Sequence, residues 1–182
     1  MTSATGSNVQ RIASLKDFAA SYPASRHNVE VLRSIGKAYL AGENFSEAAT
    51  TFASITNKYP GTAEAYYLLG TTYEKQQPDS ALISWGKAAE VTPVSAWTAR
   101  ALHSLMQHSQ AHKNYSRAVA CAKRIISEFP YTISAARFYE TLAEAYTLNG
   151  NFDEAIALCS EEPEKNSSEQ MSLFGKNCLR QT

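Results

Sequence analysis

Apolar side chains recur at three- and four-residue intervals along most of the chain, and short polar or proline-containing segments separate these stretches. This spacing places the apolar residues on one face of an α-helix, whereas a half-buried strand would alternate residue by residue. The segment between residues 29 and 60 predicts two helices separated by a turn at Gly42 and Asn44, two residue types that tolerate turn geometry. The inner faces are Leu32, Ile35, Gly36 and Tyr39 in the first helix and Phe45, Ala48, Phe52 and Ile55 in the second.

Four proline-containing tetrads divide the chain at nearly regular intervals. They are Tyr22-Pro23-Ala24-Ser25, Tyr59-Pro60-Gly61-Thr62, Thr92-Pro93-Val94-Ser95 and Phe129-Pro130-Tyr131-Thr132. Their prolines lie 37, 33 and 37 residues apart, close to the period of roughly 34 residues found in helix-turn-helix repeats. Proline disfavours helical angles in the residue before it, and the Ser or Thr two residues later is expected to cap the next helix. The pattern predicts an all-α array of antiparallel helix pairs, an architecture that binds other molecules along an extended surface.

The later units repeat this plan with substitutions. Their inner-face and turn residues are Tyr66, Leu69, Gly70, Tyr73, Ala81, Trp85 and Ala88, then Leu102, Leu105, Met106, Asn114, Tyr115, Ala118, Ala122 and Ile125, then Tyr139, Leu142, Ala143, Tyr146, Asn151, Phe152, Ala155 and Cys159. Gly36 lies where the two helices of a hairpin approach closely. Because a glycine inside a helix costs about 1 kcal/mol relative to alanine, we expect close packing against Gly36 to compensate.

Seventeen basic and seventeen acidic residues cancel, so the summed charge attracts neither nucleic acid nor an anionic membrane. The sequence has no run of roughly 18 apolar residues, so no membrane insertion is expected. The first ten residues are polar and lack the apolar stretch of a secretion signal. We therefore expect a cytoplasmic protein, with a periplasmic location as the alternative if the chain is a truncated domain.

Candidate chemistry is sparse. No phosphate-binding glycine loop, nucleophile elbow or paired-carboxylate motif occurs, so we expect neither catalysis nor a cofactor. Cys121, Cys159 and Cys178 are too widely spaced for a zinc or redox pair, and we expect the first two to be buried. His108 and His112 are four residues apart, close to His103, but no Cys or acidic residue completes a metal-ligand set.

The paired units resemble the tetratricopeptide repeat family. The matching residues are Ile35, Gly36, Tyr39, Phe45, Ala48, Phe52 and Pro60 in the first unit and Leu69, Gly70, Tyr73, Ala81, Trp85, Ala88 and Pro93 in the second. The third unit has Met106 in place of glycine, and the fourth lacks the closing proline. The resemblance implies a right-handed superhelical, TPR-like α-solenoid over residues 8–160. We expect a half repeat at 8–25, repeats at about 26–61, 62–94, 95–131 and 132–160, a polar break at 161–167 and a C-terminal capping helix at 168–180.

The resemblance also implies a non-catalytic protein–protein interaction scaffold that binds a peptide or helix of a partner in a concave groove. The first helix of each pair would line this groove, with Glu30, Arg33, Lys37, Tyr67, Thr71, Glu74, Arg100, His103, Gln107, Arg137, Glu140 and Glu144. Its basic residues would attract acidic peptides and its acidic residues basic ones. The alternative for each charge is an ordinary solvated helix face.

One detail of this groove differs from better-known cases. Some members of the family hold acidic chaperone tails with a clamp of Lys, Asn and Arg. Arg33 and Lys37 stand at its first two positions, but Leu68 and Ser104 replace later ones, so we do not predict chaperone-tail binding.

The two tryptophans have different predicted roles. Trp85 occupies the aromatic core position of a second helix. Trp97 begins a first helix, where it faces either the core or the groove, and we expect the core because tryptophan is buried on average.

Two other functions stay open. The Tyr/Phe-Pro-x-Ser/Thr tetrads, carried by residues 18–25 and 52–62, resemble the repeats of the β-barrel-assembly lipoprotein and the Tol-Pal-associated periplasmic coordinator. That likeness implies an assembly module of the bacterial cell envelope. The array could instead regulate or tether an enzyme. We also expect self-association through the N-terminal half repeat, because a half repeat leaves one helix face unpaired.

Overall fold

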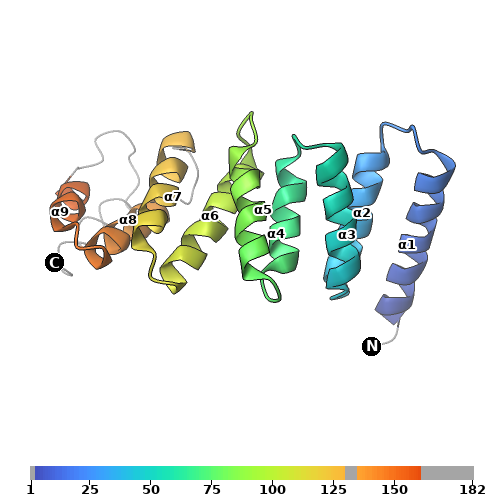
Figure 1. The fold of residues 1–182 in the computed structure, drawn as a ribbon, viewed down its shortest axis with the longest axis horizontal. Coiled ribbons are helices and arrows are strands. Elements are labelled where there is room, and N and C mark those ends of the chain that lie inside the picture. The colour runs from blue at the N-terminus through green and yellow to red at the C-terminus, as the bar shows by residue number, and fades with distance from the viewer. Residues whose placement is uncertain (1–2, 130–134, 161–182) are drawn as a thin grey trace. The chain divides into compact units, whose positions relative to one another are not determined.

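The computed structural model describes residues 3–129 and 135–160, with side chains for 9–129, 139 and 141–158. Every regular element in these ranges is a helix, which confirms the all-α class (Figure 1). The helices are α1 (Ser3–Ser21), α2 (Asn28–Ala41), α3 (Phe45–Lys58), α4 (Ala63–Tyr73), α5 (Pro78–Glu90), α6 (Ala96–Ala111), α7 (Tyr115–Glu128), α8 (Ala135–Leu148) and α9 (Phe152–Ser160). The predicted polar break, the capping helix and Cys178 lie outside the described residues.

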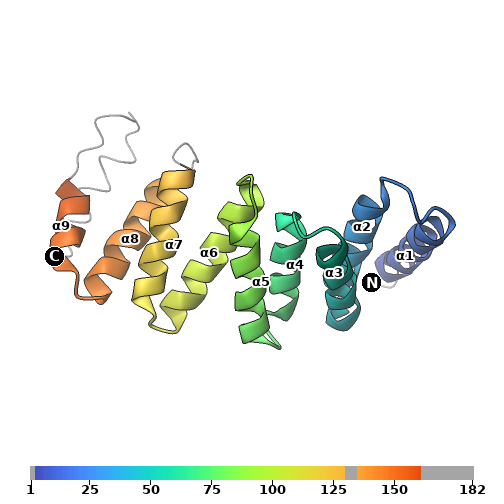
Figure 2. The same cartoon turned by 45° about the horizontal axis from the view of Figure 1, so that its top comes forward.

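The chain forms two compact units, Met1–Ala101 and Leu102–Thr182. In the first unit, each of the helices α1 to α4 packs against the next one along the chain. In the second, α8 packs between α7 and α9. Consecutive helices within a unit run in opposite directions in both views (Figures 1 and 2). α1 begins at Ser3, ahead of residue 8, the predicted start of the half repeat.

Two glycines permit the close approach of paired helices in the first unit. A Cβ atom on Gly36 of α2 would lie 2.6 Å from Cε1 of Phe52 on α3. A Cβ atom on Gly70 of α4 would lie 2.5 Å from Nε1 of Trp85 on α5. Both rings are almost completely buried, with exposed fractions of 0% and 1%. The expected packing against Gly36 is therefore confirmed, and the same contact recurs in the next pair.

In the third helix pair, the large core residue lies on the first helix and the small one on the second, the reverse of the first two pairs. Met106 stands at the glycine position of the third pair, and Ala122 stands seven residues after Tyr115, where Phe52 follows Phe45. Met106 and Ala122 are both buried. A large residue on the first helix thus accompanies a small one on the second, which keeps the total core volume similar.

Three of the described turns between paired helices, those that lead into α3, α7 and α9, share a backbone conformation. The residues before Asn44, Asn114 and Asn151 have positive φ angles, 58° at Glu43, 57° at Lys113 and 79° at Gly150. Asn114 also caps α7, because its Oδ1 accepts a hydrogen bond of 3.2 Å from the N–H of Arg117.

The predicted capping by Thr62 is wrong in detail. Thr62 precedes α4, but its hydroxyl makes no capping hydrogen bond. Its carbonyl oxygen instead accepts from the N–H groups of Ala65 and Tyr66 at 3.1 and 3.3 Å. Thr132 lies outside the described residues.

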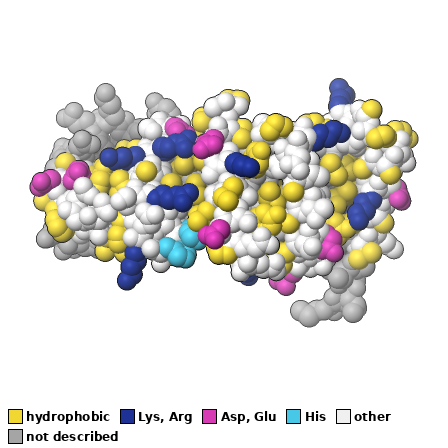
Figure 3. Space-filling model, in the orientation of Figure 1, with side chains coloured by type: hydrophobic (Ala, Val, Ile, Leu, Met, Phe, Trp, Pro, Cys, Tyr) yellow, Lys and Arg dark blue, Asp and Glu magenta, His cyan; other side chains and the backbone are white. Residues whose placement is uncertain are grey.

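Among the described helices, none combines the length and hydropathy that a membrane span requires. Basic, acidic and apolar side chains are interspersed over the face shown in Figure 3. This mixture agrees with the formal net charge of zero.

Candidate functional site

Six residues of the first unit gather where the first helices of successive pairs adjoin. We call this set the cationic cluster: Arg33 and Lys37 of α2, Glu64 and Tyr67 of α4, and Trp97 and Arg100 of α6. The cluster contains three cations and one carboxylate, so it carries two formal positive charges.

Glu64 ties α2 to α4. The Nη1 of Arg33 donates a hydrogen bond of 2.8 Å to Glu64 Oε2, and the Nζ of Lys37 donates one of 2.5 Å to Glu64 Oε1. The carboxylate is buried, with 10% of its side chain exposed, whereas the side chains of Arg33 and Lys37 are 33% and 45% exposed. Charge-assisted hydrogen bonds of this kind are among the strongest in proteins. Each oxygen of the buried carboxylate is therefore satisfied by one cation from the neighbouring helix.

The start of α6 places Trp97 beside α4. Ser95 Oγ accepts a hydrogen bond of 3.3 Å from the N–H of Trp97, and Thr98 Oγ1 accepts one of 3.0 Å from the N–H of Ser95. The predicted capping role of Ser95 is thus confirmed. The Trp97 ring lies 5.5 Å from the Tyr67 ring at an interplanar angle of 42°. Trp97 is only half-buried and contacts groove positions, so the expectation of core packing is wrong. Trp85 does pack in the core, as predicted.

Two cations lie against the Trp97 ring. The guanidinium carbon of Arg100 is 4.5 Å from the ring centroid, and the Nζ of Lys37 is 5.5 Å away. A cation over an indole ring gains about 0.5–2 kcal/mol, depending on how far it is desolvated. Lys37 is shared between Trp97 and Glu64. Among the described residues, Arg100 has no carboxylate partner, and its side chain is exposed.

The structure brings together four of the predicted groove residues: Arg33, Lys37, Tyr67 and Arg100. Thr71 lies one turn along α4, where its hydroxyl donates to the Tyr67 carbonyl at 3.1 Å, and Glu74 follows the end of α4. His103, Gln107 and Glu144 belong to the second unit. The side chains of Arg137 and Glu140 lie outside the described residues. A role of any of these residues in binding stays a prediction.

Sequence reasoning missed Glu64 as a groove residue. Glu64 lies three residues before Tyr67, a spacing that puts both on one helix face. Trp97 stands in the same relation to Arg100. This spacing predicts that both residues lie on the groove face, but it does not predict the ion pairs that Glu64 makes.

The histidines of α6 and the turn after it form a stacked pair. The rings of His108 and His112 are 4.0 Å apart with an interplanar angle of 12°. His112 Nδ1 lies 2.9 Å from the carbonyl oxygen of His108. In the described part of the chain, no three His, Cys, Asp or Glu side chains are grouped closely enough to hold a metal ion.

The one described free cysteine, Cys121 of α7, is buried, as predicted. Burial raises the pKa of its thiol, against the smaller opposite effects of Arg117 and Arg124. Such a thiol stays protonated and unreactive at neutral pH. The side chain of Cys159 lies outside the described residues.

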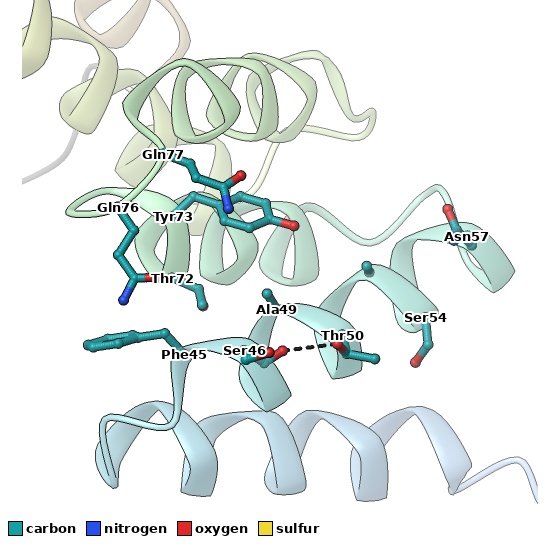
Figure 4. A pocket seen from close by; sticks show the side chains of 11 residues that line it. Phe45, Ser46, Ala49, Thr50, Ser54, Asn57, Thr72, Tyr73, Gln76 and Gln77 are labelled. Atoms are coloured by element: carbon teal, nitrogen blue, oxygen red, sulfur yellow. Dashed lines mark hydrogen bonds between the residues drawn. The ribbon is translucent and has the colours of Figure 1, made fainter.

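A separate pocket of about 620 Å³ lies between α3, α4 and the turn that precedes α5 (Figure 4). It is lined by Phe45, Ser46, Ala49, Thr50, Ala53, Ser54, Asn57, Thr72, Tyr73, Gln76 and Gln77. The hydroxyls of Thr50, Ser54 and Thr72 donate to backbone carbonyls of their own helices. The pocket therefore presents amides and hydroxyl oxygens but no charge, and this lining selects no particular ligand.

Comparison with known proteins identifies the family. The profile of the tetratricopeptide repeat family matches residues 33–103 and 108–169. The chain therefore belongs to the tetratricopeptide repeat family. Its members are protein-interaction scaffolds and are generally non-catalytic, and the chain falls in this functional class. No curated protein matches the chain.

Solved structures show the same fold. The crystal structure of MamA is 21% identical, with 97% of this chain and 87% of MamA covered and a TM-score of 0.66. BtubC from P. vanneervenii is 12% identical over 98% of this chain and 77% of its own, with a TM-score of 0.68. Naa15/Naa10 bound to HypK-THB is 14% identical over 93% and 26%, with a TM-score of 0.65. At these identities the likeness shows the fold alone, a TPR-like array of helix pairs.

Proposed function

We propose that this chain binds an extended peptide segment of a partner protein on the first-helix face of residues 28–101, with the cationic cluster as the main contact. The observation that carries this proposal is the half-buried Trp97, which lies against Tyr67, Lys37 and Arg100. Tryptophan, tyrosine and arginine dominate the binding energy of protein interfaces. We further propose that the chain has no catalytic role of its own.

The arrangement suits binding because much of the cluster is already ordered. Arg33 and Lys37 are held by Glu64, and Arg100 lies over Trp97. A side chain that is immobilised before binding loses less conformational entropy when the partner arrives. The cationic cluster is therefore a better candidate for the binding site than the dispersed charges elsewhere on the surface.

Selection from a random-sequence peptide library displayed on phage tests the proposal. We expect the chain of residues 1–182 to enrich peptides that lose affinity by about tenfold or more when Trp97 is replaced by alanine, equivalent to about 1.4 kcal/mol. Phe152→Ala is the matched control, because Phe152 is an exposed aromatic residue of the second unit. Peptides that bind both variants and the parent protein equally would contradict the proposed site.

The envelope-assembly and enzyme-tethering functions, the cytoplasmic location and self-association through residues 8–25 stay predictions. No contact among the described residues favours one of them over the others.

A further inference from the structure

We infer that Asn149 is a site of spontaneous deamidation, and that the hydroxyl group of Ser116 promotes the reaction. The site lies outside the proposed binding surface, in the turn between α8 and α9. Asn149 is the one asparagine in the sequence that precedes a glycine. The modification converts its neutral amide into a carboxylate, with water as the only co-reactant.

The reaction joins two groups of the same turn. The main-chain nitrogen of Gly150 gives up its proton to hydroxide and attacks Cγ of Asn149. As the N–Cγ bond forms, the Cγ–Nδ2 bond breaks, and Nδ2 takes up a proton from water and leaves as ammonia. Water then opens the cyclic imide to give aspartate or isoaspartate, in which the main chain runs through the former side chain.

Gly150 permits this attack. It has no Cβ to obstruct the approach of its nitrogen, and a Cβ atom added there would meet nothing within 4 Å. Asn149 and Gly150 are both exposed to water. The N–H of Gly150 donates a hydrogen bond of 3.1 Å to the carbonyl oxygen of Thr147, so the attack requires this bond to open. Hydrogen bonds of exposed turns open at a small free-energy cost, so the reaction can proceed in the folded chain.

Ser116 of α7 stabilises the intermediate of the attack. Its Oγ donates a hydrogen bond of 3.3 Å to Oδ1 of Asn149. Negative charge develops on this oxygen when the nitrogen adds to Cγ, and a donor already directed at such an oxygen lowers the barrier. On the other side, Oδ1 of Asn151 accepts from Nδ2 of Asn149 at 2.6 Å. The two side chains together orient the amide group of Asn149.

The product weakens the attachment of α9. A carboxylate at position 149 has no N–H to donate to Oδ1 of Asn151, whose Nδ2 already donates to Oε1 of Glu154 at 3.0 Å. The new charge therefore lies close to the charge of Glu154 and repels it. Isoaspartate also lengthens the main chain in a turn that the N–H of Asn151 closes by donating to the carbonyl oxygen of Tyr146 at 2.9 Å. Because α9 packs against α8, deamidation should loosen this helix pair.

Mass spectrometry of the full chain, kept folded at mildly alkaline pH in water enriched in heavy oxygen, tests the site. We expect Asn149 to convert to labelled aspartate and isoaspartate. Asn44, Asn114 and Asn151 should stay unconverted over the same period, because each precedes an aromatic residue whose Cβ obstructs the attack. Conversion of Asn151 as fast as that of Asn149 would overturn the inference. Conversion of Asn149 in urea but not in the native protein would also overturn it.

The role of Ser116 has its own test. Ser116→Ala should slow the conversion about fivefold, the effect of one net hydrogen bond on the barrier. Ser127→Ala is the matched control, because Ser127 is an exposed serine of the same helix whose hydroxyl donates to the carbonyl oxygen of Arg124. It should leave the rate unchanged. An equal or higher rate in Ser116→Ala would overturn the role of Ser116 and leave the site itself standing.

Asn149→Asp reproduces one of the two products. We expect amide hydrogen exchange in α9 to be about fivefold faster than in the parent protein, because one hydrogen bond of the turn is lost. Asn44→Asp adds the same charge at the start of α3 and should leave the exchange of α9 unchanged. Unchanged exchange in Asn149→Asp would show that deamidation does not loosen the pair of α8 and α9.

Discussion

The close approach at Gly36 allows a quantitative prediction about stability. Replacing Gly36 with alanine adds a Cβ atom 2.6, 2.7 and 3.1 Å from three atoms of the Phe52 ring. Non-bonded carbon atoms prefer separations of about 3.5–4.0 Å. The ring is completely buried, so relief requires the ring or the two helices to move by about 1 Å.

Two opposing effects set the size of the change. Alanine is favoured over glycine inside a helix by about 1 kcal/mol. Overpacking a core by one methyl group costs about 1–3 kcal/mol, and a rigid buried ring puts Gly36 at the upper end. We therefore expect Gly36→Ala to lower the free energy of unfolding by about 1–2 kcal/mol.

Gly86 supplies the matched control. It lies within α5, and a Cβ atom added there would meet nothing within 4 Å. Gly86→Ala should therefore raise the free energy of unfolding by about 0.5–1 kcal/mol, from helix propensity alone. Urea unfolding followed by far-ultraviolet circular dichroism would measure both changes. If Gly36→Ala proved as stable as Gly86→Ala, the packing of α2 against α3 would be wrong.

A double substitution isolates the contact itself. Phe52→Leu removes the ring atoms that collide with the new Cβ, so it should reduce the cost of Gly36→Ala. We expect a coupling free energy of at least about 0.5 kcal/mol between the two sites. Additive effects of the two substitutions would show that the loss arises elsewhere. Met106 with Ala122 in the third pair illustrates the same compensation in the natural sequence.

Two further predictions concern exposure. Trp97 is half-buried, whereas Trp85 is 1% exposed. Acrylamide should therefore quench fluorescence strongly in a Trp85→Phe protein, which retains Trp97, and weakly in a Trp97→Phe protein, which retains Trp85. The reverse order would contradict the placement of Trp97. Burial raises the pKa of Cys121, so iodoacetamide should label this thiol in urea much faster than in the native protein at neutral pH, as followed by mass spectrometry; equal rates would show that the thiol is accessible. Because the folded protein holds the Cys121 proton more tightly, stability should also fall as the pH rises past the pKa of the unfolded thiol.

The helix pairs could be predicted because each depends on residues close together in the sequence. The three- and four-residue spacing of Leu32, Ile35 and Tyr39 produces a continuous apolar face in any helix, whatever that helix later packs against. Pro60 ends α3 through a local steric effect on Tyr59. The glycine contact was also readable, since a glycine inside a helix calls for a close neighbour.

The site was only partly predictable. Arg33, Lys37 and Arg100 could be predicted because the resemblance to the family assigns the groove to the first helix of each pair. Trp97 was placed in the core, since burial is the average habit of its side chain. Its true surroundings depend on Tyr67 from another helix pair.

Residue spacing within each pair thus determined the helices, their turns and the face that each one buries, because these follow from interactions over a few residues. The tertiary structure decided which charges meet. Glu64 lies 31 residues from Arg33 and 27 from Lys37, and only the packing of α2 against α4 brings its carboxylate between them. An ion pair depends on the distance in space between two charged groups. That distance cannot be inferred from their separation in the sequence, because it depends on how the helices pack.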